Sequence, residues 1–159
     1  ANVLKRKELE QAVEFFGKKR FGICNEGLLM YLNRDEQATV AEFIRTILIK
    51  SGGSWITPDI GSFEQMEQSF NRHTTETRQV VESIILGISN ETGRNIKDGY
   101  FKTEKDAIKF YSDLGFSIEM FPFYDGKGLH TYSLIPENLR QKILDSLLIK
   151  KAWILRPKK

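Results

Sequence analysis

The chain has 159 residues, 40% of them hydrophobic and 28% charged, which is enough for one domain with a real core and excludes a disordered chain. Its 24 Lys and Arg against 21 Asp and Glu give a net charge of +3, which permits nucleic-acid binding without arguing for it. A single cysteine, Cys24, excludes an intramolecular disulfide, and no apolar run approaches the ~20 residues of a membrane span. We therefore expect a cytoplasmic protein without membrane association.

The sequence before residue 51 has three segments, of which the middle one has no clear secondary-structure pattern. Apolar residues at helical spacing predict a first helix over residues 3–16. Residues 20–32 are ambiguous between a strand and a helical turn, because Asn25-Glu26-Gly27 interrupts their apolar residues. A helix then runs to about Lys50, with Asn33 or Asp35 as its N-cap.

The stretch 62–88 is the part of the sequence that points to a class of function. A short amphipathic helix is predicted at its start, where Phe63, Met66 and Phe70 share one face. After a polar turn at Asn71-Arg72-His73, a longer helix begins with polar residues and ends with apolar ones. The apolar residues expected to be buried in this second helix are Val80, Val81, Ile84, Ile85 and Ile88. This is the outline of a helix-turn-helix.

The polar start of the second helix predicts contacts with DNA. A recognition helix reads bases in the major groove with its N-terminal residues. Arg78 and Gln79 can form paired hydrogen bonds to guanine or adenine, and Thr75 can reach phosphate or base. Arg72 and His73 are expected against the DNA backbone. We predict a small regulatory protein that binds double-stranded DNA, and we expect a homodimer because one recognition helix buries little surface.

The same stretch also has a simpler interpretation. A pair of amphipathic helices joined by a polar turn occurs in any helical domain. Glu76, in the first turn of the second helix, would be repelled by phosphate unless it read a cytosine amino group. Both interpretations stay open at the level of the sequence.

The second half of the chain predicts a mixture of helix and strand. Tyr100-Phe101 is a candidate short strand, and Thr103 caps a helix that closes at Gly115. Residues 116–120 alternate between apolar and polar, as in a half-buried strand. Trp55-Ile56-Thr57, earlier in the chain, is a further short strand.

A hairpin and a closing helix complete the prediction. Asp125-Gly126-Lys127-Gly128 is a strong turn signal, residues 129–135 form the returning strand, and a last helix runs over residues 137–150. Beside a helix-turn-helix this hairpin would be a wing, with Lys127 and His130 touching phosphate, although a whole helix intervenes. The expected class is α+β, in one compact domain of residues 1–159 or in two lobes, 1–90 and 99–159.

The alternative function is a protein-interaction module without catalysis. Aromatic residues dominate interface cores, and the patch predicted here comprises Phe121, Phe123, Tyr124 and Trp153. With Tyr132 the hairpin rings would be a platform for stacking bases, but core or cross-strand packing is the commoner role of such rings. Trp153-Ile154-Leu155 either pairs as a terminal strand or covers the core.

The search for chemistry gives little. Cys24, His73 and His130 cannot form a spaced set of metal ligands, and the sequence has neither a phosphate-binding loop nor a dinucleotide fingerprint. We expect Cys24 to be a small buried hydrophobic residue. The sequence therefore predicts no catalytic residue, no metal and no cofactor, and it favours a protein without enzymatic activity, although scattered carboxylates would leave no recognisable pattern.

Overall fold

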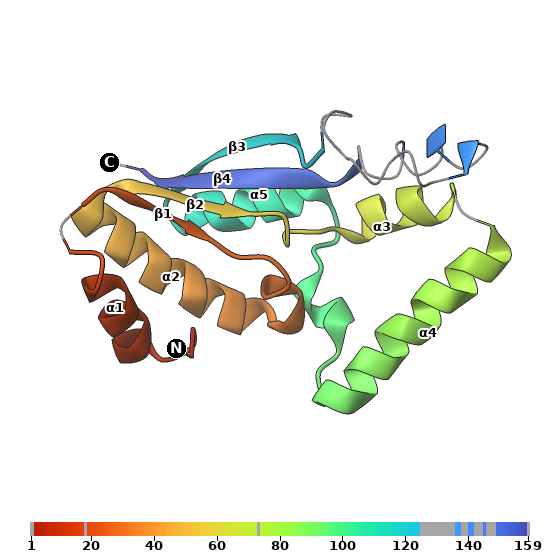
Figure 1. The fold of residues 1–159 in the computed structure, drawn as a ribbon, viewed down its shortest axis with the longest axis horizontal. Helices are drawn as coiled ribbons and strands as arrows, with labels where there is room; N and C mark the ends of the chain where they lie inside the picture. Colours follow the sequence, from red (N-terminus) through yellow and green to blue (C-terminus); the bar gives the residue numbers. More distant parts are fainter. Residues whose placement is uncertain are drawn as a thin grey trace.

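The structure is a computed structural model, and it confirms the predicted α+β class (Figure 1). It describes residues 2–17, 19–72, 74–124, 136–137, 140–141, 145 and 149–158. The helices are α1 (Arg6–Glu14), α2 (Arg34–Ser51), α3 (Phe63–Phe70), α4 (Thr75–Thr92) and α5 (Glu104–Asp113), with short 3-10 helices η1 (Leu29–Tyr31) and η2 (Ile96–Gly99). The strands are β1 (Phe21–Cys24), β2 (Gly53–Thr57), β3 (Phe116–Pro122) and β4 (Lys151–Pro157).

The four strands form one mixed sheet in the order β1-β2-β4-β3. β1 and β2 are parallel, whereas β4 is antiparallel to both of its neighbours. It follows that β1, β2 and β3 all run in the same direction, and that β4 is a reversed strand between β2 and β3. The carboxyl ends of the three parallel strands therefore meet at one edge of the sheet, together with the start of β4.

The core lies between one face of this sheet and the helices α2 and α5 (Figure 1). Trp55 is fully buried, and its ring contacts those of Tyr111 on α5 and Phe116 on β3 at centroid distances of 5.7 and 5.9 Å. Trp153 on β4 is only 1% exposed, so the prediction that it belongs to a surface patch is wrong. Cys24 points to the other face and is exposed, so the prediction that it is buried is also wrong.

Within the described residues, α2, α3 and α5 begin with a capping box, in which the cap side chain and the third helical residue satisfy each other's backbone N–H groups. The reciprocal pairs are Asn33 with Glu36 in α2, Ser62 with Gln65 in α3, and Thr103 with Asp106 in α5. Asn33 rather than Asp35 is thus the cap of α2. Each such cap stabilises its helix by about 1 kcal/mol, which explains why these starts are readable in the sequence.

Helix α4 extends away from the sheet as an arm (Figure 1). Val81, Ile85 and Ile88 are half-buried, as predicted for the side facing the body. Val80 and Ile84 are 59% and 55% exposed, so the prediction of their burial is wrong. Helical periodicity identifies residues that share a face, but here the body of the protein covers only a narrow part of it.

The remaining predictions have mixed outcomes. The candidate strand Tyr100-Phe101 reduces to one isolated bridge between Phe101 and Ser62. Trp153-Ile154-Leu155 pairs in the interior of the sheet as part of β4. The hairpin turn and returning strand at 125–135, with Lys127 and His130, lie outside the described residues, as does most of the predicted helix over residues 137–150.

Candidate functional site

The loops that follow β1 and β2 are joined by the carboxylate of Asp59. It accepts hydrogen bonds from the backbone N–H groups of Gly27 (2.8 Å), Leu28 (2.7 Å) and Leu29 (3.1 Å). It also accepts one from the side-chain amide of Asn25 (2.7 Å). Because these four donors come from the segment after β1 and the acceptor comes from the segment after β2, Asp59 fixes the shape of the sheet edge.

Asn25 connects the same edge to the core. Its amide nitrogen also donates to the hydroxyl of Thr57 (3.1 Å), and its amide oxygen accepts from the indole N–H of Trp55 (2.6 Å). Trp55 and Thr57 are both fully buried. The position of the loop after β1 is therefore set by side chains that the core itself holds.

A cavity of about 420 Å³ opens at this edge, and we call it the edge pocket. It is lined mostly by apolar side chains from the end of β2, α3, α4 and the start of β4, with a few polar groups among them. The lining residues used below are Met30, Asp59, Ile60, Gln65, Tyr100 and Lys151. An apolar cavity of this size with few converging polar groups is the usual form of a small-molecule site.

Tyr100 places a hydroxyl group in the wall of the edge pocket. Burial raises the pKa of Tyr100, and the negative charge of Asp59 raises it further. Its ring lies against Gly61, where a Cβ atom would be 2.9 Å from the ring carbon Cε1. The absence of a side chain at Gly61 therefore allows the ring to reach this position.

A second polar group lies beside the edge pocket. The carboxylate of Glu104 pairs with the ammonium of Lys151 (2.7 Å) and accepts a hydrogen bond from the amide of Gln65 (2.9 Å). These residues belong to α5, β4 and α3 respectively. The pairing leaves Lys151 neutralised at the wall of the pocket.

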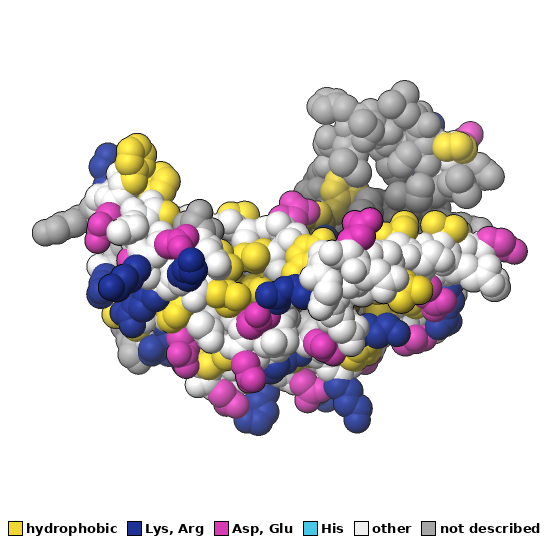
Figure 2. Space-filling view, turned by 90° about the horizontal axis from the view of Figure 1, so that it is seen from below, with side chains coloured by type: hydrophobic (Ala, Val, Ile, Leu, Met, Phe, Trp, Pro, Cys, Tyr) yellow, Lys and Arg dark blue, Asp and Glu magenta, His cyan; other side chains and the backbone are white. Residues whose placement is uncertain are grey.

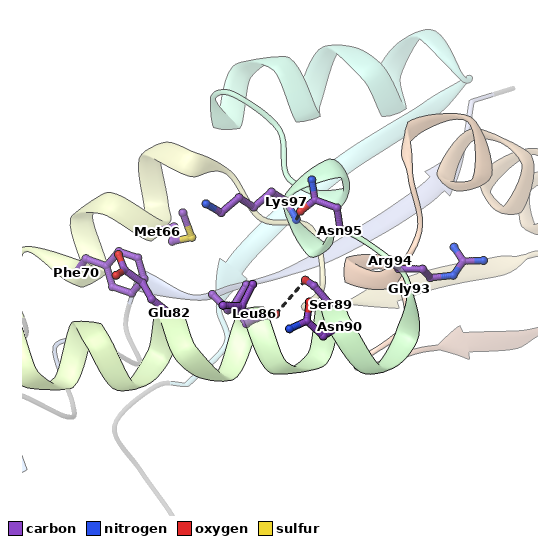
Figure 3. A pocket seen from close by; sticks show the side chains of 11 residues that line it. Met66, Phe70, Glu82, Leu86, Ser89, Asn90, Gly93, Arg94, Asn95 and Lys97 are labelled. Atoms are coloured by element: carbon purple, nitrogen blue, oxygen red, sulfur yellow. Dashed lines mark hydrogen bonds between the residues drawn. The ribbon is translucent and has the colours of Figure 1, made fainter.

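A larger groove of about 910 Å³ lies between the arm helix α4 and the body (Figure 3), and we call it the arm groove. It shares Met66, Phe70 and Ile85 with the edge pocket, so the two hollows meet at these side chains. Its other lining residues are Glu82, Leu86, Ser89, Asn90, Gly93, Arg94, Asn95 and Lys97.

Arg94 fixes the far end of the arm groove to α2. Its guanidinium forms two hydrogen bonds with the carboxylate of Glu36 (2.6 and 3.1 Å) and one with the carbonyl oxygen of Tyr31 (2.9 Å). The hydrogen bond from Arg94 lowers the pKa of Glu36 below its usual value. The end of α4 is thus held against the body at a defined position.

The residues predicted to contact DNA lie at the corner between α3 and α4. Thr75 and Gln79 are exposed. The guanidinium of Arg78 pairs with Glu82 (3.0 Å) and Glu67 (3.7 Å), and the hydrogen bond to Glu82 raises its pKa. Base reading by Arg78 would first require these contacts to break.

Arg72 and His73 were also predicted to contact DNA, at the turn between α3 and α4. Arg72 donates to the backbone carbonyl of Asp145 (2.9 Å), and His73 lies outside the described residues. On the face drawn in Figure 2, Lys and Arg side chains are interspersed with Asp and Glu. Among the residues that the structure describes on this face, basic and acidic side chains therefore alternate instead of separating into regions of one sign.

The aromatic residues of the alternative interaction patch separate into two groups. Phe121 and Phe123, at the end of β3, are 38% and 42% exposed, and the ammonium of Lys150 lies 4.8 Å from the Phe123 ring centroid. Tyr124 is half-buried, and Trp153 belongs to the core. The exposed part of this patch is therefore smaller than predicted.

Sequence reasoning missed the Asn25–Asp59 connection. The available signal was a polar residue within two positions of the end of each of two strands, which in a parallel pair places both at the same edge of the sheet. That signal requires β1 to be recognised, and the segment containing it was ambiguous.

Comparison with known proteins adds no assignment: no protein-family model matches the sequence, and a search of curated proteins found no match. Within the part of the chain that the structure describes, no helix has the length and apolar character needed to cross a membrane. The same residues contain no group of three or more His, Cys, Asp or Glu side chains able to hold a metal ion.

Proposed function

We propose that the protein is an enzyme that binds S-adenosylmethionine at the carboxyl end of β1 and transfers its methyl group to a substrate held in the edge pocket. Ligands of open α/β sheets bind outside the carboxyl ends of the parallel strands. The edge pocket lies at that place, with Asp59 and Tyr100 in its wall. We choose this cofactor because the backbone N–H groups of the loop after β1 already donate hydrogen bonds to Asp59.

Backbone N–H groups after a strand are where phosphate-bearing cofactors normally bind. Here the N–H groups of Gly27, Leu28 and Leu29 already donate to the Asp59 carboxylate. A pyrophosphate would meet a negative charge instead of free donors. A nucleoside cofactor without phosphate, with a sulfonium and an ammonium group, has the charge that suits this edge.

Glu26 supports the same choice. It is exposed in the loop after β1, and among the described residues no cation pairs with its carboxylate. An exposed carboxylate without a paired cation can accept hydrogen bonds from ribose hydroxyls. Glu26 and Asp59 are therefore the residues that would hold the nucleoside and its positive charge.

The residues of the edge pocket would bind and orient the substrate. S-adenosylmethionine, when bound, supplies an electrophilic methyl group. Met30 and Ile60 would exclude water from the pocket, and the hydroxyl of Tyr100 would donate a hydrogen bond to the substrate. These are positioning roles, because the chemistry belongs to the cofactor.

Calorimetric titration tests the proposal. S-adenosylmethionine should bind, and ATP, which shares the adenosine but carries a triphosphate, should bind at least about tenfold more weakly. Glu26→Gln should weaken S-adenosylmethionine about five- to tenfold, as expected for a hydrogen bond to a charged group. The matched control is Glu91→Gln, an exposed residue of α4 that lines neither hollow. Tighter binding of ATP, or no binding of S-adenosylmethionine, would remove the proposal.

A protein-interaction role is the second candidate, favoured by the exposed rings of Phe121 and Phe123. Replacing both with Ala should abolish capture of a protein partner at an unchanged melting temperature if this role is correct. A large loss of stability would identify the rings as structural instead.

Binding of double-stranded DNA stays a prediction. Fluorescence anisotropy with a random duplex at several salt concentrations tests it, because phosphate contacts make affinity fall steeply as salt rises. The paired variant Arg78→Ala with Gln79→Ala should then lose affinity, and unchanged affinity would exclude reading by this helix.

A further inference from the structure

The charges that line the arm groove are not balanced. Glu82 is paired with Arg78 (3.0 Å), and Arg94 is paired with Glu36 (2.6 Å). Lys97 is the remaining charged residue of the lining, and no ion pair joins it to any residue in the described ranges. The groove therefore presents one unmatched positive charge.

The position of Lys97 directs this charge into the hollow. Its backbone N–H donates to the side chain of Asn95 (3.2 Å), which holds the start of η2. Figure 3 shows the Lys97 side chain reaching across the groove toward Met66 on α3. An ammonium on a flexible stem is thus available to a ligand that enters between the arm and the body.

Part of the wall opposite Lys97 is apolar. Leu86 on α4 is 62% exposed, and Met66 and Ile85 are half-buried at the junction with the edge pocket. A ligand that covers these side chains removes apolar surface from water, which favours binding by roughly 25 cal/mol per Å² of that surface. The groove, at about 910 Å³, is within the usual size of a small-molecule site.

We propose that the arm groove binds a small organic anion, which would be the part of the proposed enzyme's substrate that extends beyond the edge pocket where the two hollows meet. Its apolar body would lie on Met66, Ile85 and Leu86, and its anionic group would pair with Lys97. The charge complementarity at Lys97 favours this occupant over a neutral apolar molecule. The designation of the anion as substrate rests on the proposed function, whereas the binding itself does not.

Two fluorescent probes with similar aromatic bodies test this inference. 8-Anilinonaphthalene-1-sulfonate carries an anionic group, and N-phenyl-1-naphthylamine does not. Lys97→Met keeps the apolar stem of the side chain and removes its charge. It should weaken the sulfonate about three- to tenfold, the range of a charge-assisted contact at a partly exposed site, and leave the neutral probe unchanged.

The controls place the probes in the groove. Lys105→Met removes an exposed lysine of α5 that lines neither hollow, and should change neither affinity. Ser89→Trp fills the groove from α4, and should weaken both probes while the melting temperature shows that the chain stays folded. High salt should reduce the difference between the wild type and Lys97→Met.

Three results would overturn the inference: no binding of the sulfonate, equal sulfonate affinity in Lys97→Met and the wild type, or an equal loss for both probes in Lys97→Met. A probe-to-protein ratio of one to two would identify the groove as a contact between two copies and would also overturn it. Calorimetry with Glu26→Gln tests the cofactor separately. Failure there, with the expected probe pattern here, would remove the enzyme but keep the anion site.

Discussion

Replacing Asp59 with alanine should destabilise the protein strongly, although Asp59 is not part of the hydrophobic core. The change removes one acceptor and leaves four donors, three backbone N–H groups and the Asn25 amide, without it. A hydrogen bond to a charged group contributes about 1.5–3 kcal/mol, but the four share one carboxylate and water can replace part of them. We expect a loss of about 3 kcal/mol.

Thermal unfolding measures this loss directly. With an unfolding entropy of roughly 2 cal/mol/K per residue, a loss of about 3 kcal/mol lowers the melting temperature of a chain of this length by roughly 9 °C. The control is Asp113→Ala, which removes an exposed ion pair with Lys109 and should cost less than about 0.5 kcal/mol. If Asp59→Ala melts within about 2 °C of that control, the carboxylate does not hold the sheet edge as described.

Three other changes test separate parts of the structure. Glu36→Gln should reduce the loss of stability that the wild type shows between about pH 5 and 3. The pKa of Glu36 is lowered by Arg94, so this pairing stabilises the fold above the unfolded-state pKa and is lost as the pH falls through the folded-state pKa. Urea titrations at several pH values measure the effect, and an unchanged dependence of stability on pH would contradict it. Gly61→Ala should cost about 1–3 kcal/mol by pushing a Cβ atom against the Tyr100 ring, and a crystal structure with the ring unmoved would contradict that cause. Gln37→Leu should lower the free energy of unfolding by about 2 kcal/mol, as measured by chemical denaturation. The side-chain amide of Gln37 is 2% exposed and donates to backbone carbonyl groups, which the substitution would leave buried without a donor. A stability equal to that of the wild type would refute this.

Helices with local signals were predictable from the sequence. Asn33 and Thr103 predict the starts of α2 and α5, because a capping box is formed by two residues that are three positions apart in the sequence. The strand β3 was predictable for a similar reason, since Phe116, Ile118 and Met120 alternate with polar residues.

Non-local structure was not predictable in the same way. β1 has four residues, and its identity as a strand comes from pairing with β2, which begins 32 positions later in register. Trp153 is of a residue type that is common in protein interfaces. It is nevertheless buried in the middle of the sheet, because β4 lies between β2 and β3. A strand order of this kind depends on pairing that no local pattern contains.

The candidate site has the same limitation. Asn25 and Asp59 are 34 positions apart in sequence and meet only because β1 and β2 are parallel neighbours. Val80 and Ile84 were predicted to be buried but are exposed. Their spacing shows that they share a helical face, but it does not show whether another element covers that face. The edge pocket and the arm groove therefore became visible only with the fold.

The most direct test of the proposed function is amide chemical-shift mapping during titration with S-adenosylmethionine. The account predicts that the largest shifts occur in the loops after β1 and β2, at residues 25–28 and 59–61. Shifts concentrated at the start of α4, around residues 75–79, would move the binding site to the predicted DNA-contacting surface. No shift at either sheet-edge loop at saturating ligand would contradict the assignment of this edge as the cofactor site.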